Sequence, residues 1–241
     1  MSEFLVPDWP APRGVRALVT TRAGGVSAGP WSSFNLGDHV GDDYAAVLEN
    51  RRRLRTELPD HPKWLNQVHG IACVDATELT MPVEADASFT RKTNVVCAVL
   101  TADCLPVLLC DESATVVAIA HAGWRGLAAG VLESTIKSMQ IDPQRLLAWL
   151  GPAIGPDAFE VGGEVRNVFV EHDAQAEQAF VSHANDKWTA DLCELARLRL
   201  SAMGIRRVTS TNWCTATNAQ QFYSYRRDGI TGRMASCIWL A

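Results

Sequence analysis

The middle of the chain carries three short apolar runs that are rich in β-branched residues, at 95–100, 107–110 and 115–120. Runs of this length and composition are typical of buried strands. The gap between the second and third runs is short enough to predict a hairpin. From Leu127 to Met139 the apolar residues recur with a helical period instead. The pattern over 116–139 therefore predicts a strand, a tight turn and a helix.

The rest of the chain predicts further strands and helices. Strands are expected at 15–20, 64–68, 71–75, 146–150, 221–226 and 233–240, and helices at 44–57, near 165–170 and at 190–203. Asp42 or Asp43 is placed to cap the first helix, and Gly204 to end the last. Because no long linker, repeat or low-complexity segment interrupts the sequence, we expect one α/β domain with mixed sheets over 1–241.

Composition narrows the class of protein. The 241 residues are 47% hydrophobic and 20% charged, as in globular proteins, and the formal net charge of -5 argues against a general nucleic-acid binder. The longest apolar run, 95–110, contains Thr101, Asp103 and Pro106, so no membrane span is expected. The N-terminus does not resemble a signal peptide, and seven irregularly spaced cysteines do not resemble a disulfide framework. We therefore expect reduced thiols and a cytoplasmic location.

Three potential metal ligands lie beside turns at the ends of expected strands: His69, Cys104 and His121. Cys sulfur and His nitrogen commonly hold zinc, and catalytic zinc sites use three protein ligands with water in the fourth position. Zinc lowers the pKa of that water toward about 7. Our central prediction is that the three side chains converge on one metal ion.

Two other interpretations of these residues stay open. Cys104 can be a core cysteine while each histidine bonds to the backbone, and spacing alone favours this interpretation, because the three residues are far apart and match no common metal-ligand pattern. Alternatively, Cys104 can be a nucleophile with His121 or His69 as its base. The sequence does not separate these roles.

At these motifs the chain resembles the laccase-domain family. The resemblance rests on WLNQVHG at 64–70, TADCLPV at 101–107 and HAGWRG at 121–126, and extends to NLGDH at 35–39, LGPAIG at 150–155 and FYSYRRD at 222–228. Bacterial members have been called polyphenol oxidases, purine nucleoside phosphorylases and peptidoglycan editing factor. The resemblance implies a single four-layer α/β/β/α domain with mixed sheets, similar to the catalytic domain of a bacterial deamidating toxin. It also implies zinc held at the positions of His69, Cys104 and His121.

The resemblance implies small-molecule chemistry: phosphorolysis of adenosine, inosine and methylthioadenosine, and adenosine deamination. In some members the implied activity is instead hydrolysis of misincorporated serine from a peptidoglycan precursor. A copper-dependent polyphenol oxidase is disfavoured, because multi-copper sites need many imidazoles and this chain has six His and no His-x-His run. Copper can still enter a zinc site adventitiously. A binding protein with a structural metal is a further alternative.

Two residues outside the metal group are candidates for catalysis. Arg125 lies at the start of the helix predicted over 126–139, where free N–H groups and the helix dipole attract anions such as phosphate. His39 is a candidate proton donor or partner of the metal ligands. The alternatives are an arginine on a helix surface and a loop histidine in solvent.

Six further residues are candidates for substrate binding. Asp103 and Gln67 can orient a ligand histidine or cap a turn, and the glycine turn after Arg22 can cradle an anion. Glu160 is a candidate acid or base. Tyr223 and Tyr225 alternate along an expected strand, so we expect them to share a face. This face can stack on a purine, although the half-buried face of a strand is the more common reason for such a pair.

Overall fold

The computed structural model describes residues 4–241, which form three β-sheets. In spatial order, the five-stranded sheet contains β1 (Phe4–Leu5), β2 (Val15–Thr20), β14 (Met234–Leu240), β6 (Val96–Thr101) and β3 (Pro62–Lys63). The six-stranded sheet contains β13 (Arg207–Ser210), β9 (Leu146–Leu150), β7 (Leu105–Asp111), β8 (Val117–Ala122), β5 (Ala87–Thr90) and β4 (Cys73–Asp75). A small antiparallel sheet contains β10 (Glu160–Gly162), β12 (Lys187–Ala190) and β11 (Phe180–Ser182).

Both large sheets are mixed. The pairs β3–β6, β4–β5 and β13–β9 are parallel, whereas the remaining pairs in these sheets are antiparallel. The helices are α1 (Tyr44–Arg55), α2 (Trp124–Ala129), α3 (Val131–Met139), α4 (Gly163–His172), α5 (Leu192–Ala202) and α6 (Tyr225–Asp228). Short 3-10 helices occupy Gly29–Trp31, Ala76–Glu78, Pro143–Arg145 and Ala174–Ala179.

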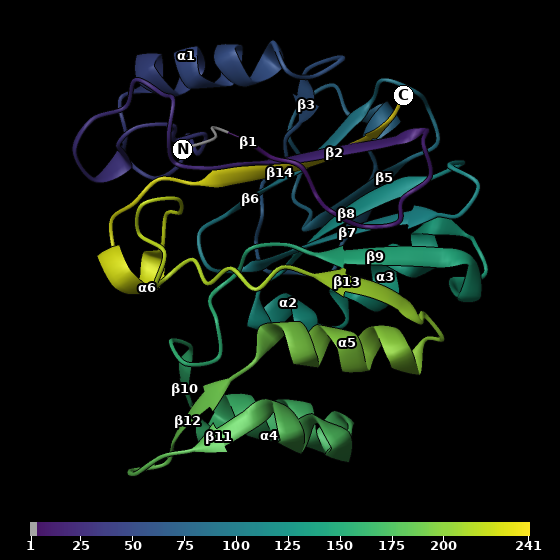
Figure 1. Ribbon diagram of the computed structural model, residues 1–241, viewed down its shortest axis with the longest axis vertical. Helices are drawn as coiled ribbons and strands as arrows, with labels where there is room; N and C mark the ends of the chain where they lie inside the picture. The colour runs from purple at the N-terminus through teal and green to yellow at the C-terminus, as the bar shows by residue number, and fades with distance from the viewer. Residues whose placement is uncertain (1–3) are drawn as a thin grey trace.

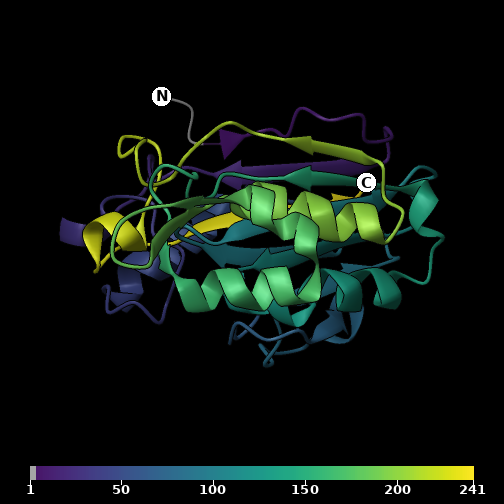
Figure 2. The same cartoon turned by 90° about the horizontal axis from the view of Figure 1, so that it is seen from below.

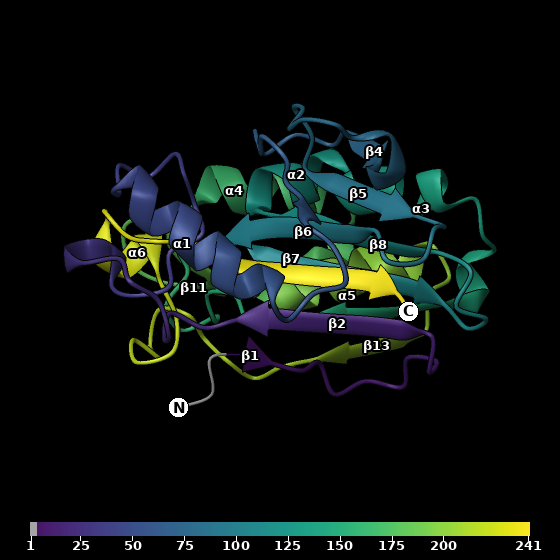
Figure 3. The same cartoon turned by 90° about the horizontal axis from the view of Figure 1, so that it is seen from above.

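The two large sheets stack face to face between outer layers of helix (Figure 1). Helix α1 crosses the five-stranded sheet on one side (Figure 3), and α4 and α5 lie on the opposite side of the molecule (Figure 2). This arrangement confirms the predicted four-layer α/β/β/α architecture. Among residues 4–241, none of the helices has the length and hydrophobicity that crossing a bilayer would require.

Alternation of side chains along each strand builds the layers, because successive side chains point to opposite faces of a sheet. Along β6, Val96 and Ala98 pack beneath α1 in the cluster that includes Leu54, whereas Cys97 and Val99 pack between the two sheets. The strands of the six-stranded sheet divide their side chains in the same way between the inter-sheet core and the helices. These strands are apolar on both faces, which explains why their sequences read as continuous apolar runs.

Most of the predicted elements are confirmed within one or two residues, including the hairpin of β7 and β8. Asp43 caps α1 by accepting a hydrogen bond from the N–H of Ala45. Gly204 follows α5 with a φ of 92°, a left-handed conformation that glycine adopts readily.

Three predicted elements are wrong. The helix expected over 126–139 is two helices, because Gly130 adopts a left-handed φ of 103° between α2 and α3. No strand forms at 64–68, where a side-chain carboxylate, that of Asp86, accepts the backbone hydrogen bonds of Val68 and the next two residues. The strand expected at 221–226 is replaced by a loop and α6, whose first turn is capped by the Ser224 hydroxyl.

Candidate metal centre

The three predicted ligands come from neighbouring chain segments at one end of the six-stranded sheet. Cys104 occupies the turn between β6 and β7, and His121 is the penultimate residue of β8. The antiparallel register pairs Pro106 with His121, so the start of β7 lies beside the end of β8. His69 lies in the loop between β3 and β4, with a left-handed φ of 59°. The fold thus brings three residues that are far apart in sequence to one place.

Their potential ligand atoms all lie within 4.8 Å of one another. Sγ of Cys104 is 3.8 Å from Nε2 of His69. Tetrahedral zinc with ordinary Zn–N and Zn–S bonds would hold such atoms about 3.5 Å apart, so the donor set fits a metal ion with small side-chain adjustments. His121 is buried, Cys104 half-buried and His69 exposed, which leaves one side of the group accessible. Metal binding itself stays a prediction.

Asp86 orients the ring of His121 and positions the loop that carries His69. Its carboxylate lies 2.8 Å from Nδ1 of His121, which leaves Nε2 of that ring available to a metal. It also accepts hydrogen bonds from the N–H groups of Val68, His69 and Gly70 at 2.7–3.1 Å. Burial opposes the charge of Asp86, but the hydrogen bonds from His121 and the loop amides lower the pKa of its carboxyl. A histidine–carboxylate pair of this kind is typical of metal sites.

Gly123 provides the space in which the ligands meet. A Cβ atom at this position would lie 2.9 Å from Sγ of Cys104 and 2.9 Å from Cδ2 of His69. Both distances are shorter than real Cβ contacts, so a larger residue would displace the ligands. The glycine beside His121 is therefore required by the geometry of the centre.

In the metal-free centre the mutual attraction of Cys104 and His121 favours a thiolate beside an imidazolium. Burial works against both charges, but the attraction between Cys104 and His121 outweighs it. The pKa of Cys104 falls to about 6, and the pKa of His121, which Asp86 also raises, reaches about 9. Because metals bind thiolate rather than thiol, Cys104 is prepared for ligation at neutral pH. The same thiolate character would serve a nucleophile, so this alternative stays open.

The three ligands line a cavity of about 780 Å³. Its wall also contains aromatic and aliphatic side chains, three arginines and a further histidine. The apolar residues are Leu65, Trp124, Ile154, Phe159 and Tyr225, and the others are Arg125, Arg226, Arg233 and His39. A cavity whose apolar walls surround convergent polar groups is the usual form of a small-molecule site.

The structure places five of the other candidates in this cavity: Arg125, His39, Gln67, Asp103 and Tyr225. Arg125 is exposed in the first turn of α2, with its guanidinium 4.5 Å from the ring centre of Trp124. Burial, followed by the charge of Arg233, lowers the pKa of His39 below its ordinary value of 6.5. His39 is therefore neutral at pH 7, with one ring nitrogen to donate and one to accept.

Asp103 and Gln67 bond to the scaffold rather than to a ligand histidine. The Asp103 carboxylate accepts hydrogen bonds from the Thr215 hydroxyl at 2.6 Å and the Arg226 N–H at 2.7 Å. The Gln67 side chain donates to the carbonyl of Leu100 and accepts from its N–H. Asp103 thus fixes two C-terminal segments beside Cys104, and the carboxylate that orients His121 is Asp86 instead.

Arg22, Glu160 and Tyr223 are not among the residues that line the cavity. Arg22 donates to the carbonyls of Ser32 and Ala219, Glu160 pairs with Lys187 at 3.4 Å, and the buried Tyr223 donates its hydroxyl to the carbonyl of Trp31. The expectation that Tyr223 and Tyr225 share one face is wrong, because the chain turns into α6 between them. Tyr225 is exposed, whereas Tyr223 is fully buried.

Three residues of the site, Asp86, Arg226 and Arg233, were not predicted from the sequence. Asp86 lies just before β5 and carries no local motif, since its partners are 16–35 residues away in the sequence. Arg226 belongs to the FYSYRRD motif at 222–228, which supports the resemblance. Its two adjacent arginines are the sequence signal that could have indicated a cationic group at the site.

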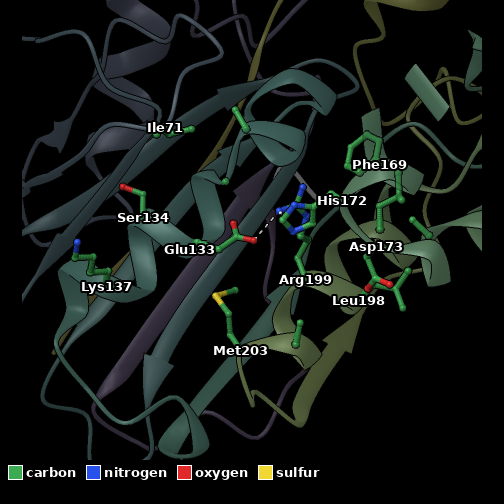
Figure 4. A pocket seen from close by; sticks show the side chains of 15 residues that line it. Ile71, Glu133, Ser134, Lys137, Phe169, His172, Asp173, Leu198, Arg199 and Met203 are labelled. Carbon is green, nitrogen blue, oxygen red and sulfur yellow. Dashed lines mark hydrogen bonds and ion pairs between the residues drawn. The ribbon is translucent and has the colours of Figure 1, made fainter. Parts of the chain in front are cut away.

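A second cavity, of about 640 Å³, lies among α3, α4 and α5 (Figure 4). Its polar centre is the Glu133 carboxylate, which accepts a hydrogen bond from Arg199 at 2.9 Å, and Arg199 also lies 3.0 Å from Nε2 of His172. Apolar side chains such as Phe169 and Met203 form much of its wall. None of the predicted site residues lines this cavity, so the candidate chemistry is confined to the other one.

The fold and the site define a mixed α/β protein with a His/Cys/His group that can hold a metal, set in a cavity for a small molecule. Residues 16–241 match the family model described as multi-copper polyphenol oxidoreductase laccase, and the chain belongs to this family. Within residues 4–241, His69, Cys104 and His121 are the one group of three or more potential ligands. These residues fit one metal ion rather than the several coppers of the family's description.

Relatives of the chain are named as enzymes. Purine nucleoside phosphorylase PA4543 of Pseudomonas aeruginosa is 56% identical over 100% of this chain and 99% of its own. Purine nucleoside phosphorylase YfiH of Escherichia coli is 54% identical, with full coverage of both chains. The crystal structure of Neisseria meningitidis protein NMB0706 has a TM-score of 0.97 at 50% identity and covers 99% of each chain. These names support an enzyme with a small-molecule substrate.

Proposed function

We propose that the chain is a purine nucleoside phosphorylase. A phosphate oxygen forms a bond to C1′ of the ribose while the bond from C1′ to the purine nitrogen breaks. The electron pair of that bond leaves with the purine, which takes up a proton. The observation that carries the proposal is a single cavity in which the His/Cys/His group lies beside three arginines, Arg125, Arg226 and Arg233. The names of relatives that match the full length of the chain support it.

In this proposal zinc is the metal, held by His69, Cys104 and His121. The donor set of two imidazoles and one thiolate suits zinc, and the accessible side of the group gives room for one further ligand. Bound zinc would supply a Lewis acid that polarises a substrate oxygen. Asp86 keeps His121 in one tautomer through the hydrogen bond at Nδ1.

The chain's other residues bind and orient the substrates. Phosphorolysis brings an anion to the site and builds negative charge on the departing purine. Arg125 is proposed to stabilise the negative charge of the departing purine, because its guanidinium has no hydrogen-bond acceptor in the part of the chain that the structure describes. The neutral His39 is proposed to donate a hydrogen bond to the purine or phosphate. Trp124 and Phe159 offer ring faces for the base.

The proposed substrates are adenosine, inosine and methylthioadenosine, with deamination of adenosine as a second reaction of the same site. Deamination replaces the exocyclic amino group with an oxygen from water, so it needs no phosphate. A cytoplasmic location is part of the proposal, and the free thiols of all seven cysteines fit a reducing compartment.

Incubation of the purified protein with each nucleoside, with and without phosphate, tests the proposal. Chromatography should detect adenine or hypoxanthine only when phosphate is present, whereas phosphate-independent inosine would report deamination. Cys104→Ala should lower both rates by about 100-fold or more, because removing a metal ligand disrupts the centre. If the wild type forms no free base above the background of Cys104→Ala, phosphorolysis is not its activity.

A further inference from the structure

Like Arg125, two further arginines of the cavity lack a carboxylate partner within 4.0 Å among the described residues. Arg226 on α6 and Arg233, the residue before β14, both line the cavity that contains the metal group. Neither takes part in an ion pair within 4.0 Å among residues 4–241. Of the two carboxylates that line the cavity, Asp38 pairs with Arg51 at 3.1 Å, and Asp103 accepts from Thr215 and from the backbone N–H of Arg226. The charge of Asp103 also acts on Arg233, but the two side chains form no ion pair within 4.0 Å.

Each of these arginines is held in place through one nitrogen. Nη1 of Arg226 donates to the carbonyl of Glu160 at 2.8 Å, and its guanidinium lies 5.4 Å from the ring centre of Phe159. Nη1 of Arg233 donates to the carbonyls of Thr231 and Gly232 at 3.1 and 3.0 Å. Among the described residues, neither Nε nor Nη2 of either side chain has an acceptor. This edge of a guanidinium is the one that binds an oxyanion through two parallel hydrogen bonds.

Because both arginines are held in place, they are better suited to binding one ligand than to adding general positive charge to the surface. The Asp103 carboxylate fixes the first turn of α6 by accepting from the Arg226 N–H at 2.7 Å. Arg233 is half-buried beside Tyr225, with 5.9 Å between its guanidinium and the ring centre. Side chains held in one geometry lose little conformational entropy when they bind, so more of the hydrogen-bond energy appears as affinity.

We propose that Arg226 and Arg233 form a subsite for a phosphate group. It is distinct from Arg125, which lies on α2 and is left to the nucleoside. The ligand class follows from two unpaired guanidinium groups in one cavity, since tetrahedral oxyanions match their paired N–H donors. Its identification as the inorganic co-substrate rests on the proposed function. A phosphate carried by an organic substrate would present the same chemistry, so the experiment includes both sources.

Isothermal titration calorimetry with inorganic phosphate, and separately with AMP, tests the subsite in the metal-loaded full chain. Arg226→Gln and Arg233→Gln should each weaken the binding of the phosphate group by about tenfold or more, because each removes charge-assisted hydrogen bonds. The matched control is Arg52→Gln, which makes the same charge change at an exposed side chain on α1 and should stay within about twofold of the wild type. A loss of affinity for inorganic phosphate in the variants identifies the free anion as the ligand, whereas a loss confined to AMP identifies a phosphate carried by an organic substrate.

The subsite is overturned if the double variant binds both ligands as tightly as the wild type. Circular dichroism checks folding, and the exposed Arg226 provides a variant that should fold even where Arg233→Gln does not. Nucleoside cleavage in the same preparations separates the two proposals. Arginine-dependent phosphate binding without nucleoside cleavage leaves the subsite standing and refutes the function, whereas cleavage with an unchanged phosphate KM in the double variant does the reverse.

Discussion

The Asp86 carboxylate lies 2.8 Å from Nδ1 of His121 and also accepts the N–H groups of residues 68–70, the loop that carries His69. One buried side chain therefore orients one potential metal ligand and positions a second. Because Asp86 directly precedes β5, it ties both ligands to the six-stranded sheet. The position of the candidate centre depends on this contact more than on any motif around the ligands themselves.

Replacing Asp86 with alanine should weaken metal binding by about 10- to 100-fold, the usual effect of losing the carboxylate behind a ligand histidine. The variant should also lose about 2–4 kcal/mol of unfolding free energy, since the buried His121 ring and three part-buried backbone N–H groups lose their acceptor. Competition with a chromophoric chelator measures the affinity, and urea unfolding of the metal-free protein measures the stability.

Asp111→Ala is the control for this experiment. Asp111 is also a buried carboxylate that accepts backbone N–H groups, here in the β7–β8 hairpin, from Ser113, Thr115 and Val116. Its loss should lower the stability while leaving metal affinity unchanged. Equal metal affinity in the wild type and Asp86→Ala would contradict the role assigned to Asp86.

Gly123→Ala should reduce the bound metal well below one equivalent. The new methyl group would lie 2.9 Å from Sγ of Cys104, and neither this sulfur nor the backbone of β8 can move without disturbing the other ligands. Gly204→Ala is a suitable comparison, because its φ is left-handed but nothing lies within 4 Å of the added atom. That variant should lose about 1 kcal/mol of stability and keep its metal. Elemental analysis after purification distinguishes them, and full occupancy in Gly123→Ala would show that the ligand geometry was misjudged.

In metal-free protein Cys104 should be the fastest thiol to react with iodoacetamide at pH 7. Its pKa of about 6 means that the reactive thiolate predominates at that pH, and that the rate should fall as the pH drops below 6. Cys193 is similarly half-buried, but burial raises its pKa to about 12, so it serves as the internal control. Cys214, whose pKa is also lowered, should rank second. Mass spectrometry of peptides after timed labelling gives the order, and added zinc should protect Cys104.

The strands were predicted well because apolar runs and turn residues are local signals, whereas the four layers were implied by the resemblance to the laccase-domain family. The runs that became β6, β7 and β8 are buried on both faces, and their length and β-branched content were enough to identify them. Prediction failed where the conformation depends on distant partners. Residues 64–68 have the composition of a strand, but Asn66 makes only an isolated bridge with Glu84, and the Asp86 carboxylate accepts the backbone N–H of Val68 that a neighbouring strand would have paired.

The site was predictable in part for the same reason. His69, Cys104 and His121 were found from their place at turns and from the resemblance, and the structure places their ligand atoms within 4.8 Å. Asp86 could not be found, because a single aspartate before a strand has many structural roles. Tyr223 was expected at the site because a strand was predicted at 221–226, but a loop and α6 form there and Tyr223 is buried outside the cavity.

Arg199→Met should lower the unfolding free energy by about 2 kcal/mol, because it breaks an ion pair whose cation is buried. The arginine side chain is 8% exposed, and it donates to Glu133 at 2.9 Å and to the carbonyl of Ala128 at 2.8 Å. Methionine keeps the apolar stem but leaves both acceptors unpaired, although the 36% exposure of Glu133 limits the cost. Arg207→Met breaks an exposed pair with Glu112 and should cost less than about 0.5 kcal/mol. Urea unfolding of the two variants provides the test, and similar losses would mean that burial of Arg199 contributes nothing to the strength of its pair.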